Sequence, residues 1–126
     1  MNYLTLNNGV RLPQQGYGTW FIEDGVASQA VRTAVSLGYR HVDTAQAYGN
    51  EHGVGDGIRI CGVPREELFA TSKVAAEHKT YREAADSIEE TLEVMGLEYF
   101  GPDAHPQPQP WAERRGERWC FRENRE

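Results

Sequence analysis

The chain has 126 residues, of which 39% are hydrophobic, so it fits a single domain with a small core. Its formal net charge of −6 argues against nucleic acid or an anionic membrane surface as a partner, and no apolar run approaches the roughly 20 residues that span a bilayer. We expect no signal peptide, and Cys61 and Cys120, which lack metal-ligand spacing, indicate free thiols in a cytoplasmic protein.

The composition changes near residue 100. Residues 113–126 carry 5 Arg and 4 Glu, and four of the six prolines fall between positions 102 and 110. A dense charge run and clustered prolines are unfavourable for a packed core. We therefore predict a folded unit over residues 1–100 and an irregular tail over 101–126.

Two short apolar runs, at 3–6 and 10–12, flank Asn7-Asn8-Gly9 and predict a β-hairpin. Strands and helices then alternate. Strands are predicted at 16–20, 39–43 and 68–74, with a fourth beginning at 97–100.

Helices are predicted between these strands from their caps and their apolar spacing. We expect the first to begin at an Asp24 N-cap and the second at Asn50, while Thr80 and Glu83 form a capping box for the third. Glycines or prolines after each helix provide the stops. The apolar positions at helical spacing are Val26, Ala27, Ala30, Val31, Ala34 and Val35 in the first helix and Val54 and Ile58 in the second. The third helix is expected to bury Ala84, Ile88, Leu92 and Met95.

This alternation indicates an α/β protein with a parallel sheet. Two architectures fit, an open doubly wound sheet or part of a (β/α)8 barrel. An open nucleotide-binding sheet usually carries a glycine fingerprint in its first strand-to-helix turn, and residues 19–24 contain none. Because polar and aromatic residues sit at the strand ends instead, we favour a barrel, although a complete barrel needs about 250 residues.

Asp43, Tyr48 and Lys73 fall at or just after the ends of adjacent predicted strands. Taken singly, they fit a turn, a packed loop and a solvated surface. Together they form a device for proton transfer: a Lys cation favours the phenolate form of a tyrosine, and a carboxylate keeps that Lys charged. Such a group could give a proton to a developing alkoxide.

Several spaced motifs resemble the aldo/keto reductase family over residues 3–100, most closely its bacterial 2,5-diketo-gluconate-reductase-like group. The resemblance lies in Gly38-Tyr39-Arg40-His41-Val42-Asp43-Thr44-Ala45 with Glu51 and Val54-Gly55, in Tyr48-Gly49-Asn50-Glu51, in Thr71-Ser72-Lys73-Val74, and in Leu12-Pro13 before Gly16-Tyr17-Gly18-Thr19-Trp20. It implies the N-terminal half of a (β/α)8 TIM barrel preceded by a β-hairpin.

The resemblance also implies a function, hydride transfer from NADPH to the carbonyl of a small aldehyde or ketone. Tyr48 would be the general acid, tuned by Asp43 and Lys73. Gly18, Thr19 and Trp20, with Asp43, would line the cofactor and substrate mouth, and no metal is implied; for Trp20 the alternative is simple packing. We expect His41 to be structural and His52 and His78 to lie at the surface. Ala75 stands where many relatives carry a pocket Trp, which leaves the size of the substrate open.

Residues 101–108 depart from the family. Its fourth strand ends in a catalytic His, but counting from Leu97 places that position at Pro106 rather than His105, and Pro cannot serve a central strand. A coding segment for Asp-Leu-Met-Leu-Ile-His-Ser-Pro, with one G added in front and one C removed, translates to Gly101–Pro108 as it stands. We infer a compensated double frameshift, with a natural loop insertion as the alternative.

Three functional hypotheses follow from this sequence. The first is an NADPH-dependent aldo/keto reductase of which this is an N-terminal part. The second is a catalytically inactive fragment or pseudo-gene product, which we favour for the 126-residue chain by itself. The third is a non-enzymatic dinucleotide-binding regulator. The oligomeric state and the physiological substrate are left open.

Overall fold

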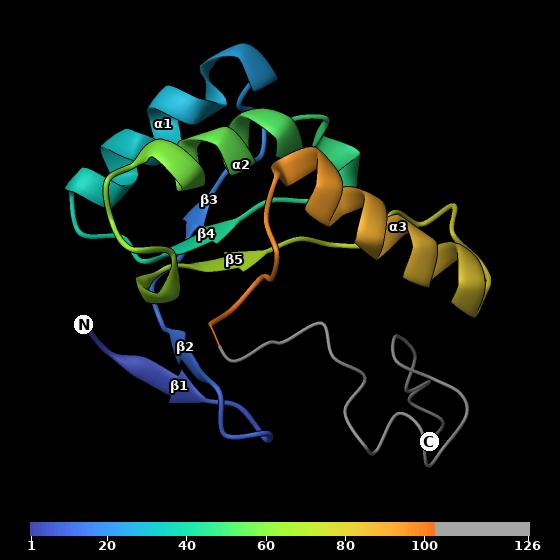
Figure 1. Cartoon of the computed structure of the whole chain (residues 1–126), viewed down its shortest axis with the longest axis horizontal. Coiled ribbons are helices and arrows are strands. Elements are labelled where there is room, and N and C mark those ends of the chain that lie inside the picture. The colour runs from blue at the N-terminus through green and yellow to red at the C-terminus, as the bar shows by residue number, and fades with distance from the viewer. Residues whose placement is uncertain (103–126) are drawn as a thin grey trace.

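The computed structural model describes residues 1–102, while residues 103–126 lie outside the described part. The chain opens with a hairpin of β1 (Tyr3–Thr5) and β2 (Arg11–Pro13) and continues as alternating strands and helices (Figure 1). These further elements are β3 (Tyr17–Gly18), α1 (Asp24–Ser36), β4 (His41–Asp43), the 3-10 turn η1 (Gln46–Tyr48), α2 (Glu51–Ile60), the 3-10 turn η2 (Arg65–Glu67), β5 (Phe69–Thr71) and α3 (Tyr81–Met95).

The predicted hairpin is present. β1 pairs antiparallel with β2, and Leu4 lies opposite Leu12. The connection closes where Leu6 N–H donates to Val10 O at 2.8 Å, and Gly9 adopts a φ of 85°. Since a residue with a side chain rarely takes that conformation, the Asn-Gly signal in the sequence identified the turn correctly.

The predicted parallel sheet is present, with shorter strands than expected. Its order is β3-β4-β5, with Gly18 paired to Asp43 and Asp43 paired to Thr71. α1 and α2 lie along one face of this sheet, and the hairpin lies on its other side (Figure 1). Val42 and Ala70 point into the core beneath the helices, where they pack with Val31, Val54 and the neighbouring buried side chains.

The predicted fourth strand is not formed in the described residues, so that prediction was wrong. Residues 97–100 run beside β5 but share a single ladder bond with it, from Ala70 N–H to Phe100 O at 2.8 Å. The carbonyls of Tyr99 and Phe100 instead accept hydrogen bonds from the guanidinium of Arg65. The chain then bends at Gly101 and turns at Pro102, whose lack of an N–H prevents further pairing.

Most of the irregular tail predicted for 101–126, and with it most of the inferred frameshift segment, lies outside the described residues. Only Gly101 and Pro102 are described, and neither is in a strand. Gly101 is buried, and a Cβ there would come within 2.4 Å of the Phe69 ring. The division of the chain near residue 100 stays a prediction.

The caps of α1 and α2 differ from the sequence prediction. Glu23, not Asp24, is the N-cap of α1, and no side chain caps that helix. The Asp24 carboxylate reaches across to α2 instead, where it accepts from the N–H of Gly53 at 2.7 Å. Asn50 is the N-cap residue of α2 as predicted, but its side chain makes no cap bond. An acidic side chain of α1 thus satisfies one of the N–H groups in the first turn of α2.

α3 has the predicted capping box, in which Thr80 and Glu83 each accept from the other's backbone N–H. Its buried face is partly polar. Ala84, Leu92 and Met95 are buried as expected, but Ile88 is only half-buried, and Ser87 and Thr91 are buried beside them. Of the apolar positions noted in α1, Val26 is exposed and Ala30 is half-buried. Strict apolar spacing missed the hydroxyl residues because their partners lie on other elements.

Three glycines of α2 let other backbone segments approach closely. A Cβ at Gly53 would lie 2.3 Å from Asp24 O, and one at Gly57 would lie 2.8 Å from Ser28 O, both on α1. Gly55 faces the end of α3, where a Cβ would meet Met95 O at 2.2 Å. Helix-interior glycine is normally unfavourable, so these residues serve the packing of α2 between its two neighbours.

Candidate functional site

The carboxyl end of the sheet gathers the residues that the sequence singled out. Asp43 is the last residue of β4, Tyr48 is the last residue of η1, and Lys73 follows β5 by two residues. Because parallel strands end at the same edge of a sheet, these segments come together there. The chain continues the β4–β5 pairing past the strands, since Thr44 N–H donates to Thr71 O and Gln46 N–H donates to Lys73 O.

Lys73 is the centre of this cluster. Its Nζ lies 2.8 Å and 2.7 Å from the two carboxylate oxygens of Asp43 and 2.8 Å from the main-chain oxygen of Thr44. It also lies 3.4 Å from Tyr48 Oη. An ammonium group has three N–H donors, so one each can serve Asp43, Thr44 and Tyr48. The structure therefore brings the three predicted catalytic side chains into one hydrogen-bonded group.

The charge of Lys73 is stabilised by its partners. Partial burial opposes the ammonium form, but the hydrogen bonds to Asp43 and Tyr48 and the charge of Asp43 outweigh it, so the pKa of Lys73 is raised. The side chains of Lys73 and Asp43 are still 50% and 32% exposed. The group is thus a charged pair at an accessible surface, within reach of a ligand.

The direction of the hydrogen bonds leaves Tyr48 a free proton. An ammonium can only donate, so Tyr48 Oη is the acceptor in its contact with Lys73. The hydroxyl hydrogen of Tyr48 is then available for another acceptor. A carbonyl oxygen placed there would receive a hydrogen bond, and a proton transferred along it would leave a phenolate beside an ammonium.

The expected mouth residues lie beside this cluster but differ in exposure. Gly18 pairs with Asp43, and a Cβ at Gly18 would meet nothing within 4 Å. Thr19 is fully buried, and both its N–H and its hydroxyl donate to Asp43 O at 3.0 Å. Trp20 is 66% exposed and stacks on Phe21, itself 84% exposed, with ring centroids 4.3 Å apart. Trp20 is therefore not a core residue. Thr19 is buried and bonds the end of β3 to the end of β4.

Asn50 is a residue whose part in this region sequence reasoning missed. It is fully buried, and its Nδ2 donates to the carbonyls of Thr19 and Ile22 at 2.8 Å each. Its Oδ1 accepts from the Thr44 hydroxyl at 2.7 Å. Asn50 thus links the two ends of the loop that contains Trp20, at Thr19 and Ile22, to Thr44 just after β4. The sequence predicted Asn50 only as a helix cap and did not predict these hydrogen bonds to the Trp20 loop.

Of the three histidines in residues 1–102, two lie where expected. His41 is structural: its ring nitrogens lie 3.3 Å from Pro13 O and 2.8 Å from Thr71 Oγ1. Burial lowers the pKa of His41, and the hydrogen bond to Pro13 only partly opposes this. His52 is exposed as predicted, whereas His78 is half-buried in the wall of a pocket.

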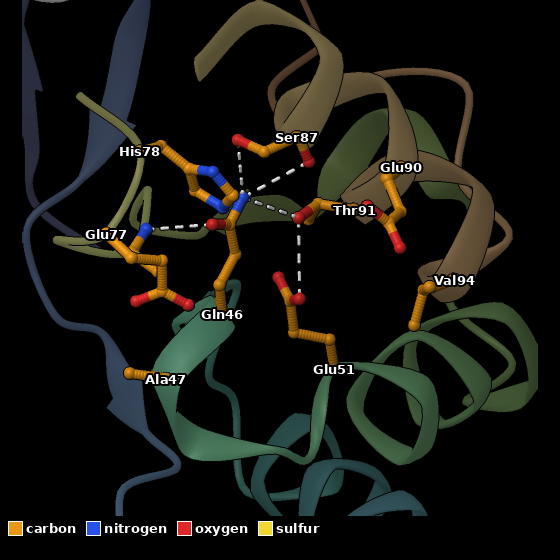
Figure 2. A pocket seen from close by; sticks show the side chains of 10 residues that line it. Gln46, Ala47, Glu51, Glu77, His78, Ser87, Glu90, Thr91 and Val94 are labelled. Carbon is orange, nitrogen blue, oxygen red and sulfur yellow. Dashed lines mark hydrogen bonds between the residues drawn. The ribbon is translucent and has the colours of Figure 1, made fainter. Parts of the chain in front are cut away.

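That pocket, of about 250 Å³, lies between η1, the segment after β5 and α3 (Figure 2). Gln46 extends from η1 toward α3, and Ser87 and Thr91 lie around its amide. The remaining lining residues are Ala47, Glu51, Ala75, Glu77, His78, Glu90 and Val94. Ala75, singled out in the sequence, lines the pocket and donates its N–H to Gln46 Oε1 at 2.8 Å.

Other kinds of site find no support in residues 1–102. No group of three or more His, Cys, Asp or Glu side chains in that range is placed to hold a metal ion. The helices of the same range are all too short or too polar to cross a membrane. Cys61 is a free, half-buried thiol whose Sγ points to the carbonyl of Ile58 at 3.2 Å.

Comparisons with known proteins give relatives of consistent kind. The chain is 50% identical over 100 residues to a "9,11-endoperoxide prostaglandin H2 reductase" of Trypanosoma cruzi, a match that covers 79% of this chain and 35% of the relative. It is 44% identical over 96 residues to a "Glycerol 2-dehydrogenase (NADP(+))" of Saccharomyces cerevisiae, covering 76% of this chain and 30% of the relative. The chain thus spans about a third of the length of these relatives.

A solved structure supports the fold. An aldo/keto reductase of Brucella melitensis superposes with a TM-score of 0.75 and 39% sequence identity, over 78% of this chain and 37% of that protein. This confirms the predicted fold, the N-terminal half of a (β/α)8 barrel preceded by a hairpin, and excludes the open sheet. The model of the aldo/keto reductase family matches residues 11–102. The chain therefore belongs to the aldo/keto reductase family, whose members are oxidoreductases.

Proposed function

We propose that this chain supplies the proton-donating part of the active site of an NADPH-dependent reductase of aldehydes or ketones. One observation carries the proposal: Lys73 Nζ bonds the Asp43 carboxylate and the Tyr48 hydroxyl at the same time. That arrangement gives Tyr48 an available proton and a cation to stabilise the charge that its loss creates. A turn, a packed loop and a solvated lysine would not require this convergence.

In the proposed reaction Tyr48 O–H donates a hydrogen bond to the substrate carbonyl oxygen. As the carbonyl carbon gains a hydride and its two electrons, negative charge builds on the oxygen, which takes the Tyr48 proton and becomes the alcohol. The ammonium of Lys73, 3.4 Å from Tyr48 Oη, stabilises the phenolate left behind. Asp43 keeps Lys73 charged and fixes its direction.

The residues present fit the reactive end of a dinucleotide. The open space at Gly18, next to the paired Asp43, admits a flat ring close to the backbone, and the exposed indole of Trp20 offers a wall. NADPH, when bound, supplies the hydride. We assign Gly18, Trp20 and Asp43 to its contact and Thr19, being buried, to support beneath them. The printed name of the yeast relative, which includes NADP(+), supports the choice of cofactor.

The substrate is proposed to be a small carbonyl compound that enters beside Trp20 and Phe21. This exposed aromatic pair would contact the apolar part of such a molecule. A cytoplasmic location and the absence of a nucleic-acid partner belong to the same proposal. The free thiol of Cys61 and the net charge of −6 support them.

A chimera tests this function. Residues 1–100 of this chain, which contain the whole proposed proton-donating group, are joined to the C-terminal remainder of the Trypanosoma cruzi relative. We expect the chimera to oxidise NADPH in the presence of a small aldehyde and to form one alcohol for each NADPH consumed. A chimera that folds and binds NADPH but forms no alcohol would overturn the proposal.

The turn at Gly101 and Pro102 favours a second candidate for the 126-residue chain alone. There the chain leaves β5 where the family resemblance implies a fourth strand with a catalytic His. We propose that the 126-residue chain by itself does not turn over substrate. If it binds NADPH without turnover, the regulator hypothesis is favoured over the inactive fragment.

A further inference from the structure

Gln46 holds together the two segments that carry Tyr48 and Lys73. It is the first residue of η1, which ends at Tyr48. Its N–H donates to Lys73 O at 3.2 Å, and its Oε1 accepts from the N–H of Ala75 at 2.8 Å. Gln46 therefore meets the chain after β5 at Lys73 itself and two residues beyond it.

The amide nitrogen of Gln46 fixes this assembly to α3. Nε2 lies 3.1 Å from each of three acceptors, the main-chain oxygen and the hydroxyl of Ser87 and the hydroxyl of Thr91, which share its two hydrogens (Figure 2). Ser87 and Thr91 are 5% and 3% exposed, so these acceptors are withdrawn from water. Leaving them without a donor would be unfavourable. Glutamate would lack the N–H groups, and asparagine would be one methylene too short.

A second arm of the same network reaches the other side of Lys73. The Thr91 hydroxyl, having accepted from Gln46, donates to Glu51 Oε1 at 3.4 Å. The other oxygen of Glu51 accepts from the Ser72 hydroxyl at 2.6 Å. Hydrogen bonds therefore fix the chain on both sides of Lys73, at Ser72 just before it and at Ala75 two residues after it.

We propose that Gln46 is a positioning residue, one that sets the separation between Lys73 Nζ and Tyr48 Oη from outside the reacting atoms. The contact it controls is sensitive, because 3.4 Å is already long for an N–H···O hydrogen bond. A displacement of a few tenths of an ångström between η1 and the segment after β5 removes it. The inference rests on the proposed function, but the geometry it predicts does not require turnover.

The chain offers a direct probe, because its sequence contains two lysines, Lys73 and Lys79. Lysine-selective isotope labelling of the 126-residue chain gives one NMR signal for each, and Lys79→Arg assigns them. The charged and titratable groups around Lys73 are Asp43, Tyr48 and His41. We expect Gln46→Leu to lower the pKa of Lys73 from its raised wild-type value, with Lys79 as the internal reference.

Matched variants separate positioning from general damage. Gln15→Leu makes the same change at an exposed position and should leave the Lys73 titration as in wild type. Thr91→Val, which keeps the side-chain shape, should move Lys73 in the same direction as Gln46→Leu and serves if Gln46→Leu does not fold. In a Tyr48→Phe background the effect of Gln46→Leu should largely vanish, because both changes act through one contact.

The outcomes distinguish this inference from the proposed function. Folded Gln46→Leu and Thr91→Val chains whose Lys73 titrates as in wild type would overturn the positioning role, whatever the chimera does. A shifted Lys73 together with an inactive chimera would support positioning and count against the reductase. In an active chimera, Gln46→Leu should lower kcat more than it changes KM for the aldehyde; a change in KM alone would contradict the proposal.

Discussion

The helix layer and the carboxyl end of the sheet are held together by different forces. Between α1 and α2, buried valines pack together and glycines bring backbone onto backbone, as where Gly57 meets Ser28. At the carboxyl end of the sheet, Lys73, Asp43 and Tyr48 are joined by hydrogen bonds and charge and remain partly exposed. The first region resists change through packing, whereas the second is arranged around a proton and a charge.

The comparison teaches where a substitution should be felt. In a closely packed region, one added methyl group lowers stability because the neighbouring backbone must move to make room for it. A partly exposed charge cluster contributes little to stability, but it controls where charge can develop in a reaction. Changes in the helix layer should therefore alter unfolding, and changes at the end of the sheet should alter chemistry.

After the loss of the Tyr48 hydroxyl, the largest effect is expected from Lys73→Met in the chimera. Without the ammonium, nothing stabilises the phenolate that Tyr48 becomes, so kcat for aldehyde reduction should fall about 10²–10³-fold. The unfolding midpoint should change little, since this pair is half exposed. Lys79→Met is the control and should keep the wild-type rate. Equal losses in the two variants would show that Lys73 has no special part.

The next effect belongs to the helix layer. Gly57→Ala should destabilise the chain by about 1–3 kcal/mol, as overpacking does, because its Cβ would lie 2.8 Å from Ser28 O. Gly25→Ala on α1 is the matched control, since its Cβ would meet nothing within 4 Å; it should stabilise the helix by about 0.5–1 kcal/mol. Denaturant unfolding measures both, and a neutral Gly57→Ala would contradict the close packing.

A smaller effect is expected from acid. Burial lowers the pKa of His41, so the unfolded chain takes up that proton first as the pH falls. The contribution of neutral His41 to stability is present above the ordinary histidine pKa of about 6.5 and is lost below it. Between about pH 7 and pH 5, His41→Gln should lose stability less steeply than wild type. His52→Gln, at an exposed site, should keep the wild-type slope.

The smallest effect concerns the 126-residue chain and NADPH. In the proposed site, Gly18, Trp20 and Asp43 would contact one end of the dinucleotide. Because the remainder of the NADPH molecule would lack such contacts, we expect weak binding. NADPH fluorescence should not saturate at micromolar concentrations of the chain. A micromolar dissociation constant would mean that the first half of the barrel binds the cofactor unaided.

Much of the fold was predictable because its signals are local. Asn-Gly marked the hairpin, apolar spacing marked the helices, and Thr80 with Glu83 marked the start of α3. The convergence of Asp43, Tyr48 and Lys73 was predictable because strand ends of a parallel sheet meet at one edge. The gathering of Asp43 and Lys73 followed from topology alone.

The missed features depend on partners distant in the chain. No local pattern predicted that the Asp24 carboxylate would accept from α2, or that Asn50 would donate to the loop at Thr19. Gln46 was overlooked because a glutamine in a loop is usually exposed. Its role depends on Ser87 and Thr91, which are 41 and 45 residues away in the sequence and lie against its amide in the fold. The spacing of Gly53 and Gly57, four residues apart on one helix face, was a readable signal of close packing.

The central claim is that Tyr48 gives the proton, and Tyr48→Phe in the chimera tests it most directly. The substitution removes one hydroxyl and keeps the ring, so NADPH affinity should barely change. Aldehyde reduction should fall about 10²–10⁴-fold, the usual effect of losing a positioned general acid. Turnover within a few-fold of the unmodified chimera, at unchanged NADPH affinity, would contradict the claim.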